Sequence, residues 1–194
     1  ERELPGMQSA GAGSDVDLVL TTRELARIVR AEHIDVEQLA DSPFDDPLGN
    51  GSGAGVIFGA TGGVMEAALR TAYFTLKGEN PPADAFKAVR SGGFQENAGV
   101  QEAEFAIGDI KLRTAAVSGL GNTRRLLQQI ERGEVHYDFV EVMACPGGCV
   151  GGGGQPIHDG EELAFARGRK LYALDAKAKL RYSHENPDIR EIYR

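Results

Sequence analysis

Residues 141–156 read EVMACPGGCVGGGGQP, and the interpretation of the whole chain depends on this stretch. It opens at the end of an apolar strand, Phe139–Met143, and continues into a loop that holds six glycines. The only two cysteines of the chain, Cys145 and Cys149, lie in that loop, four positions apart. Thiolates bind iron, and backbone N–H groups around glycine can donate hydrogen bonds to cluster sulfurs without steric conflict. The residues therefore favour an iron–sulfur site.

Three other interpretations of the two cysteines stay open on the residues alone. They could be small buried side chains beside a mobile loop. They could form a disulfide across the four-residue spacing, although a reducing compartment disfavours that bond. They could bind zinc, but such a site needs two further ligands. The nearest candidates, His136 and His158, lack the spacing of a zinc finger.

A second glycine-rich stretch lies in the first third of the chain. Residues 49–63 hold seven glycines, and we call them the first glycine cluster, with Gly147–Gly154 as the second. Glycine ahead of a helix can indicate a phosphate site, which makes a nucleotide-binding module a third and weaker hypothesis for the function. Gly53 and Gly55 have the spacing of a dinucleotide fingerprint, but Phe58 occupies the third glycine position, and the Walker motif is absent.

The overall composition is that of a globular protein with one domain or two small ones. The chain has 194 residues, a formal net charge of −8 and 41% hydrophobic residues. The acidic balance argues against nucleic-acid binding, and no apolar run approaches the length of a membrane span. Two cysteines cannot form the multi-bridge framework of a secreted domain, so we expect a reducing, cytoplasmic compartment.

Strand and helix patterns alternate along the chain. Gly108-Asp109 between two alternating segments is a hairpin signal, and Thr21 with Glu24 has the spacing of a capping box. The pattern predicts an α/β fold with an attached hairpin. The expected strands are Asp15–Leu20, Glu102–Ile107, Ile110–Ser118 and Phe139–Met143. The expected helices are Thr21–Ala31, a turn at Asp35–Leu39, Met65–Lys77, Ala83–Arg90, one from Asn122 to Gly133 with Leu126, Leu127 and Ile130 as its stripe, Asp159–Leu180 with a break at Gly168, and Asn186–Tyr193.

Several other side chains invite a plain structural interpretation. Glu66 and Arg70 are four apart and are expected to form an intrahelical pair, with buried helix-to-loop bracing as the alternative. Met65 is expected in the core, and Arg124-Arg125 on a solvated helix face. His33, His136 and His184 are expected at the surface.

The motifs together resemble one family, the iron–iron hydrogenases. EVMACPGGCVGGGGQP resembles the last cysteine motif of that family, and FGATGGVMEAALRTA at residues 58–72 resembles another of its segments. DVDLVLTTRELA at residues 15–26 and the stretch over residues 104–127 are also similar to it. The resemblance covers nearly the whole chain.

The resemblance implies an H-cluster as cofactor and H₂ with protons as substrates. This cofactor is a [4Fe-4S] cubane joined through a cysteine sulfur to a two-iron subcluster that carries CO, CN⁻ and a dithiolate. By the same resemblance, Cys145 matches a cubane ligand and Cys149 the ligand that bridges the two parts. Met143 and Phe58 match residues that line the two-iron pocket, and Gly59 lies beside it.

The chain departs from the family pattern in one important way. The family has two earlier cysteine motifs, Thr-Ser-Cys-Cys-Pro and Met-Pro-Cys, and this sequence has neither. We therefore expect residues 1–194 to be the C-terminal portion of an H-cluster domain, inactive alone and prone to self-association. The expected architecture is one lobe of a two-lobed domain, with a mostly parallel sheet flanked by helices. A small-subunit-like segment is expected to follow residues 186–194.

The resemblance also implies a ferredoxin-like or flavoprotein electron-transfer partner. The alternative function is a hydrogenase-like protein of iron–sulfur cluster assembly, or an H₂ sensor without turnover. The presence of the full Phe58–Arg70 segment favours the enzyme. By the resemblance, assembly-type relatives tend to retain the last cysteine motif better than they retain this segment, which lines the two-iron pocket.

Overall fold

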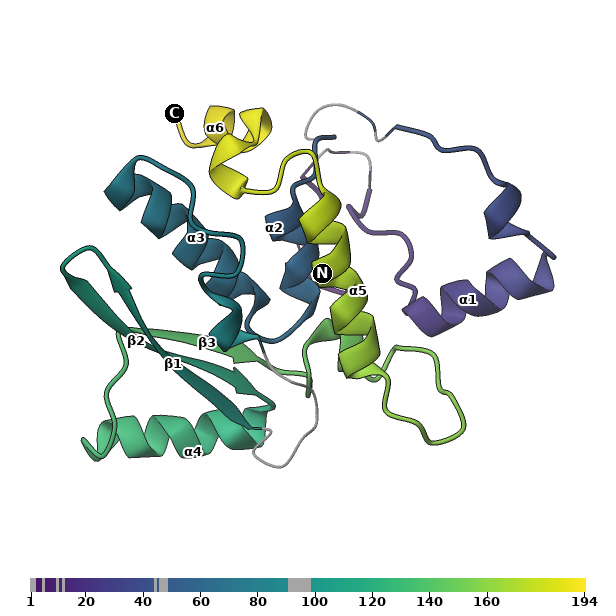
Figure 1. Ribbon diagram of the computed structural model, residues 1–194. Coiled ribbons are helices and arrows are strands. Elements are labelled where there is room, and N and C mark those ends of the chain that lie inside the picture. Colours follow the sequence, from purple (N-terminus) through teal and green to yellow (C-terminus); the bar gives the residue numbers. More distant parts are fainter. Residues whose placement is uncertain are drawn as a thin grey trace. The chain divides into compact units, whose positions relative to one another are not determined.

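The computed structural model describes residues 3–4, 6–9, 11, 13–43, 45, 49–90 and 99–194 (Figure 1). The chain divides into two compact units. Glu1–Asp41 with Gly154–Gly160 form the first, and Ser42–Gly153 with Glu161–Arg194 form the second. The sequence of Ser42–Ser52, with two prolines, two aspartates and an Asn-Gly pair, is typical of turns, and parts of it lie outside the described residues. No helix in the described ranges is long and apolar enough to cross a membrane.

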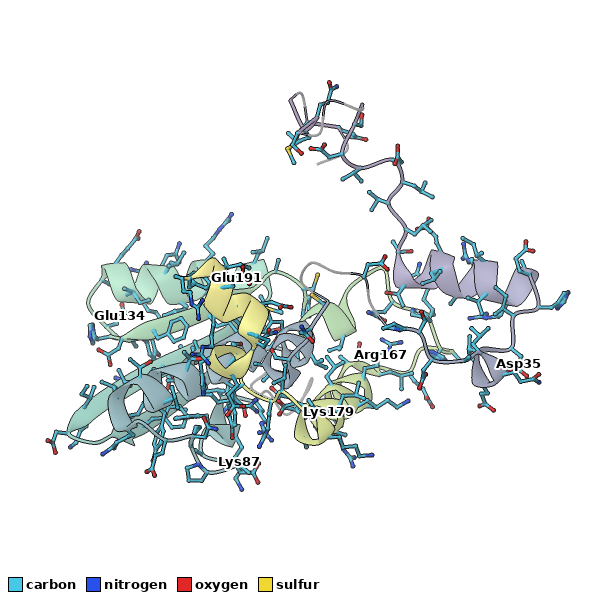
Figure 2. All side chains as sticks on the ribbon, turned by 90° about the horizontal axis from the view of Figure 1, so that it is seen from above. Asp35, Lys87, Glu134, Arg167, Lys179 and Glu191 are labelled. Carbon is cyan, nitrogen blue, oxygen red and sulfur yellow. The ribbon has the colours of Figure 1, made fainter. Side chains whose placement is uncertain are left out.

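The first unit is built around α1 (Thr22–Ala31). The Thr21 hydroxyl accepts from the Glu24 N–H at 3.2 Å, and the Glu24 carboxylate accepts from the Thr21 N–H at 2.7 Å, so the predicted capping box is confirmed. A 3₁₀ turn, η1 (Val36–Gln38), follows and is capped by Asp35, which Figure 2 labels. Within this unit the Arg23 guanidinium donates twice to the carbonyl of Gln155, at 3.0 and 2.9 Å.

The strand predicted at residues 15–20 is wrong, because this segment is irregular. A strand needs a neighbour to satisfy its backbone and to cover its apolar side chains. Here Leu18 and Val19 each stay 67% exposed. The apolar alternation was present in the sequence, but it says nothing about whether a partner strand is within reach.

The sheet of the second unit has three strands in the order β1 (Val100–Ile107), β2 (Ile110–Ser118), β3 (Phe139–Met143). β1 and β2 are antiparallel and join at Gly108-Asp109, which confirms the hairpin. β2 and β3 are parallel, because α4 (Leu120–Glu131) carries the chain back between them. The described sheet is thus mixed, with one pairing of each kind, and not mostly parallel as expected.

Helices cover both faces of this sheet (Figure 1). On one face α3 (Gly63–Lys77) places Met65 and Leu69 in a core with Ile107, and Met65 is fully buried as predicted. On the other face Leu126 of α4 packs with Ala115 and Val117. The remaining helices are α2 (Gly53–Val56), α5 (Ala164–Lys177) and α6 (Pro187–Ile192), and the 3₁₀ turns are η2 (Ile57–Gly59), η3 (Lys87–Val89), η4 (Cys149–Gly151) and η5 (Ser183–Glu185).

Local end signals located several helix boundaries correctly. Gly78 ends α3 in the left-handed conformation with φ of 73°, which glycine adopts at low cost. Asn186 caps α6, and Pro187 lies in its first turn. Arg124 and Arg125 are exposed on α4, as expected.

Other helix predictions need correction. The helix expected at Ala83–Arg90 is only the turn η3. α5 begins at Ala164, not Asp159, and it runs through Gly168 without the expected break. Gly168 is buried and packs near Ala60, the residue after η2, since a Cβ on Gly168 would lie 3.8 Å from the Cβ of Ala60. Leu127 is 51% exposed and does not belong to the apolar stripe of α4.

The Glu66–Arg70 pair exists, but it is buried and belongs to a larger network. Arg70 contacts Glu66 at 2.7 Å and Asp175 of α5 at 2.8 Å, and each of the three residues is at most 2% exposed. Arg90 also binds Glu66 at 2.7 Å, and Arg181 binds Asp175 at 3.1 Å. Burial alone would lower the pKa of Arg70, but its hydrogen bonds and the charges of the two carboxylates raise it. The intrahelical pair is thus confirmed, and Arg90 and Arg181, which lie outside the helices, add the expected helix-to-loop bracing. The contact of Arg70 with Asp175 also joins α3 to α5, which was not expected.

His33 and His136 are exposed as expected, whereas His184 is half-buried, so its expected surface position is met only in part. Its ring stacks on Phe74 with 4.2 Å between centroids and also on Tyr182 at 5.4 Å. Its Nε2 lies 2.8 Å from Oδ1 of Asn80. Burial lowers the pKa of His184, which is a packing residue between α3 and η5.

Candidate metal centre

The cysteine loop begins where β3 ends. The carbonyl of Cys145 accepts from the Gly148 N–H at 3.0 Å, which closes a turn, and η4 then starts at Cys149. Both cysteines carry exposed thiols. The interpretations as a disulfide or as two buried structural side chains are therefore wrong for this structure.

Neighbouring elements hold the loop in place despite its glycines. The Gly119 N–H donates to the Met143 carbonyl at 2.8 Å, and the Gly147 N–H donates to Oγ of Ser118 at 2.7 Å. Arg167, labelled on α5 in Figure 2, donates to the carbonyl of Val150 at 3.0 Å. The thiols thus stand on a loop that β2 and α5 support from two sides.

The loop also packs directly against the first glycine cluster. A Cβ on Gly148, whose φ is 91°, would lie 2.7 Å from the carbonyl oxygen of Gly59 and 2.8 Å from the nitrogen of Thr61. Only glycine allows so close an approach of two backbones. On its other side, a Cβ on Gly59 would lie 2.8 Å from Leu171 of α5.

Four of the five predicted site residues lie in the cysteine loop or next to it: Cys145, Cys149, Met143 and Gly59. Met143, half-buried, precedes Cys145 by two residues, and Gly59 lies under the turn at Gly148. Phe58, the fifth, is 45% exposed and directly precedes Gly59. Gly152 lies beside the sulfur of Cys145, since a Cβ there would be 3.6 Å from it.

One residue of this region was missed by the sequence analysis. Glu141 is 6% exposed in β3, where its carboxylate accepts from the Gly62 N–H and from the Met65 N–H, both at 2.6 Å. Burial raises the pKa of Glu141, and the backbone hydrogen bonds oppose that shift. Two signals were available: an acidic residue in the middle of an apolar strand, and its place at the start of the cysteine motif.

The nucleotide hypothesis does not fit this geometry. The amides at the start of α3 already donate to Glu141, so they cannot bind a phosphate. A Cβ on Gly53 would lie 2.5 Å from Oδ1 of Asp175, and one on Gly63 would lie 1.8 Å from the carbonyl oxygen of Ile57. These two glycines of the first glycine cluster serve helix packing.

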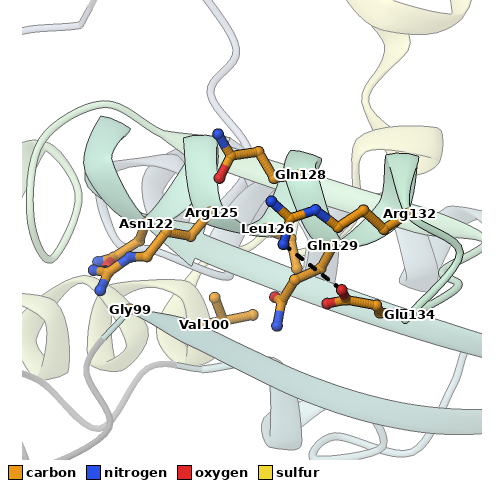
Figure 3. A pocket seen from close by; sticks show the side chains of 9 residues that line it. All are labelled: Gly99, Val100, Asn122, Arg125, Leu126, Gln128, Gln129, Arg132 and Glu134. Carbon is orange, nitrogen blue, oxygen red and sulfur yellow. Dashed lines mark hydrogen bonds and ion pairs between the residues drawn. The ribbon is translucent and has the colours of Figure 1, made fainter.

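A pocket of about 470 Å³ lies elsewhere, beside α4 (Figure 3). Polar side chains such as Asn122, Gln129 and Arg132 line it, and Arg132 pairs with Glu134 at 3.7 Å. None of the predicted site residues belongs to its lining, so the candidate centre is the cysteine loop.

The loop fits part of an iron–sulfur cluster. Two exposed thiols four residues apart are suitable iron ligands, and the glycine backbone leaves room beside them. A [4Fe-4S] cubane takes four cysteine ligands, and the described residues hold no group of three or more His, Cys, Asp or Glu side chains placed to bind a metal. This chain therefore fits half of such a ligand set.

Comparison with known families assigns the chain to a class. Residues 1–153 match the family model of the C-terminal domain of the iron only hydrogenase large subunit, and the chain belongs to this family. Residues 161–194 match the model of the iron hydrogenase small subunit. A small-subunit-like segment was expected only after residues 186–194, but the match already begins at residue 161.

Particular relatives agree with this assignment. The chain is 50% identical over 186 residues to the NADP-reducing hydrogenase subunit HndD of Solidesulfovibrio fructosivorans, covering 95% of this chain and 31% of that protein. It is 32% identical to the mouse (Mus musculus) cytosolic iron-sulfur assembly component 3, covering 92% and 37%. A solved structure of [FeFe]-hydrogenase HydA1 from Chlamydomonas reinhardtii matches with 39% identity and a TM-score of 0.65, covering 92% of this chain and 50% of that one. The chain thus spans from about a third to half of these proteins.

Proposed function

We propose that this chain is the C-terminal portion of an H-cluster domain that interconverts H₂ with protons and electrons in a longer parent protein. The observation that carries the proposal is the pair of exposed thiols, Cys145 and Cys149, on a loop built against the first glycine cluster. The 50% identity to a hydrogenase subunit over nearly the whole chain supports it.

Each residue of the centre has a role in this proposal. In this proposal Cys145 would be a cubane ligand, and Cys149 would be the ligand shared by the cubane and the two-iron subcluster. Met143 and Phe58 would line the two-iron pocket, while Gly59 lets the loop approach closely. When bound, the H-cluster supplies the redox chemistry of H₂. The glycines leave their N–H groups accessible to a cluster, since no Cβ shields them.

The decisive experiment substitutes the two cysteines one at a time in the full-length parent. Cys149→Ala should abolish retention of the two-iron subcluster and all H₂ activity, even where some cubane assembles. Cys145→Ala should primarily reduce cubane iron. Iron counts and infrared spectra of the CO and CN⁻ ligands report both outcomes. A normal two-iron signature in Cys149→Ala would contradict the bridging role.

Met143→Leu serves as the matched, milder variant. It keeps the side-chain volume nearly constant and changes only the soft contact beside the site. The 194 residues alone should bind no complete H-cluster and evolve no H₂ with a chemical reductant, because they supply two thiolates. Robust activity from these residues alone would overturn the proposal.

The second candidate function is cluster assembly or H₂ sensing without turnover. The identity to the cytosolic assembly component favours it, since that match covers 92% of the chain. Purified full-length parent separates the two functions. Sustained H₂ evolution supports the enzyme, and a protein that binds [4Fe-4S] clusters without CO and CN⁻ bands supports assembly.

We propose a cytoplasmic protein that exchanges electrons with a ferredoxin-like or flavoprotein partner. One hydrogenase relative is named periplasmic, so fractionation of cells that produce the parent is the test. Exposed apolar side chains such as Leu18 and Leu25 favour self-association of the 194 residues, which light scattering would detect.

A further inference from the structure

The buried carboxylate of Glu141 links the two segments that form the candidate centre. β3 (Phe139–Met143) contains Glu141 and Met143 and leads into the loop with Cys145, so the strand carries one side of the centre. The other side, with Phe58 and Gly59, leads through a tight turn into α3. The two carboxylate oxygens of Glu141 each accept one N–H from the start of that helix, at 2.6 Å.

The start of α3 depends on this distant carboxylate for its cap. Helices begin with N–H groups that lack partners within the helix, and a side chain at the N-cap position usually accepts from them. Here the N-cap is Gly62, with φ of 89° and no side chain to offer. A Cβ on Gly62 would lie 1.9 Å from the carbonyl oxygen of Val89, so packing excludes a local capping side chain. Glu141 supplies the acceptor from 79 residues further along the chain.

The charge of Glu141 suits this position. A carboxylate accepts at both oxygens, and the N-terminal end of a helix favours negative charge. Hydrogen bonds from N–H groups to an ionised acceptor are about twice as strong as neutral ones. The contact between Thr61 and Gly147, 3.3 Å from nitrogen to oxygen, is longer and uncharged.

We propose that Glu141 is a positioning residue: by capping α3 from β3, it fixes the cysteine loop relative to the wall formed by Phe58 and Gly59. The capping of α3 by Glu141 and its effect on the cysteine loop are argued from the structure alone. The importance of this contact for a bound cluster rests on the proposed function.

The test uses Glu141→Gln in the full-length protein, prepared without iron. Glutamine has nearly the same shape, but its amide nitrogen would face a backbone N–H, so one hydrogen bond and the charge are lost. We expect hydrogen exchange to become about ten- to a hundredfold faster at Gly62 and Met65, and faster also over Cys145–Gly152. Exchange in α4 should stay unchanged.

Asp138→Asn is the matched control. Asp138 also accepts a backbone N–H, from Arg113 at 2.8 Å, but it is exposed and precedes β3. It should leave exchange in the cysteine loop unchanged. Faster exchange confined to α3 in Glu141→Gln, with the loop unaffected, would overturn the proposal.

Two further measurements keep the proposal testable. If Glu141→Gln does not fold, native-state exchange in the unsubstituted protein replaces it. The amides of Met65 and Gly148 should then open with one shared free energy, and clearly different values would overturn the link. In the iron-loaded protein, Glu141→Gln should shift the CO and CN⁻ bands, and unshifted bands would overturn the positioning role at the cluster. A wild-type protein without such bands defeats the proposed function but leaves the exchange result intact.

Discussion

The two glycine clusters look alike in sequence, yet they serve different purposes. In the first, Gly62 and Gly63 face backbone so closely that a Cβ would lie 1.9 Å and 1.8 Å from a carbonyl oxygen. In the second, Gly148 makes a similar approach, but a Cβ on Gly152 would be 3.6 Å from the sulfur of Cys145, and one on Gly153 would meet no described atom within 4 Å. Both clusters hold tightly packed glycines and open ones, since a Cβ on Gly51 of the first would also meet no described atom within 4 Å, but only the second places a glycine beside a thiol. Glycine content alone therefore does not indicate a site.

The largest effect should come from the packed cluster. Gly63→Ala places a methyl group against the Ile57 carbonyl, and no rotamer can relieve a clash at Cβ. We expect a loss of at least about 5 kcal/mol in the free energy of unfolding, measured by urea denaturation. Gly78→Ala is the control, because only its positive φ is unfavourable, and it should cost about 1 kcal/mol. Equal losses in the two variants would contradict the packing argument.

The next effect concerns the buried charges behind the first cluster. Arg70→Met leaves Glu66 and Asp175 buried without their shared partner, and we expect a loss of about 3–5 kcal/mol in thermal or urea unfolding. Arg132→Met, which breaks an exposed pair with Glu134, should cost less than about 1 kcal/mol.

The same network predicts an acid dependence. Burial would raise the pKa of Asp175, but its hydrogen bonds from Arg70 and Arg181 outweigh this and lower it. A pKa lowered by folding adds stability above the ordinary value of the group, and that stability is lost as pH falls below about 4. The loss should be smaller in Arg70→Met. Identical acid profiles would show that Asp175 does not depend on Arg70.

The smallest effect on stability should come from the second cluster, where the effect on the cofactor is the informative one. In Gly152→Ala the methyl group would lie 3.2 Å from the Cys149 carbonyl oxygen and 3.6 Å from the sulfur of Cys145. In the full-length parent this variant should change the unfolding free energy by only about 1 kcal/mol but reduce iron content. Gly153→Ala should change neither quantity. Iron loss in both variants would mean that loop flexibility, rather than space beside the thiol, controls cluster binding.

Local signals made much of the fold predictable. The capping box at Thr21, the hairpin turn at Gly108-Asp109 and the end of α3 at Gly78 are each decided within a few residues, and all three are confirmed. The failures have the opposite character. The strand at residues 15–20 depended on a partner, and the burial of Arg70 depended on Asp175, which lies 105 residues away.

The residues of the candidate site likewise fall into two groups, those that a contiguous motif predicts and those that depend on distant contacts. Cys145 and Cys149 were found because their motif is contiguous, and the exposed loop agrees with a role in binding. Glu141 lies within the same motif, but its partners are the amides of Gly62 and Met65. Its function as a cap becomes visible only when β3 and α3 are placed together.

The contact between Arg70 and Asp175 has a consequence for the evolution of these two positions. Arg70 lies in the part of the chain that matches the large-subunit family, and Asp175 lies in the part that matches the small-subunit family. If a gene were divided between these parts, each product would carry half of a buried ion pair, and mixing products from distant species would risk mismatched charges. Selection should therefore conserve the opposite charges at the two positions together, whether one gene or two genes encode them.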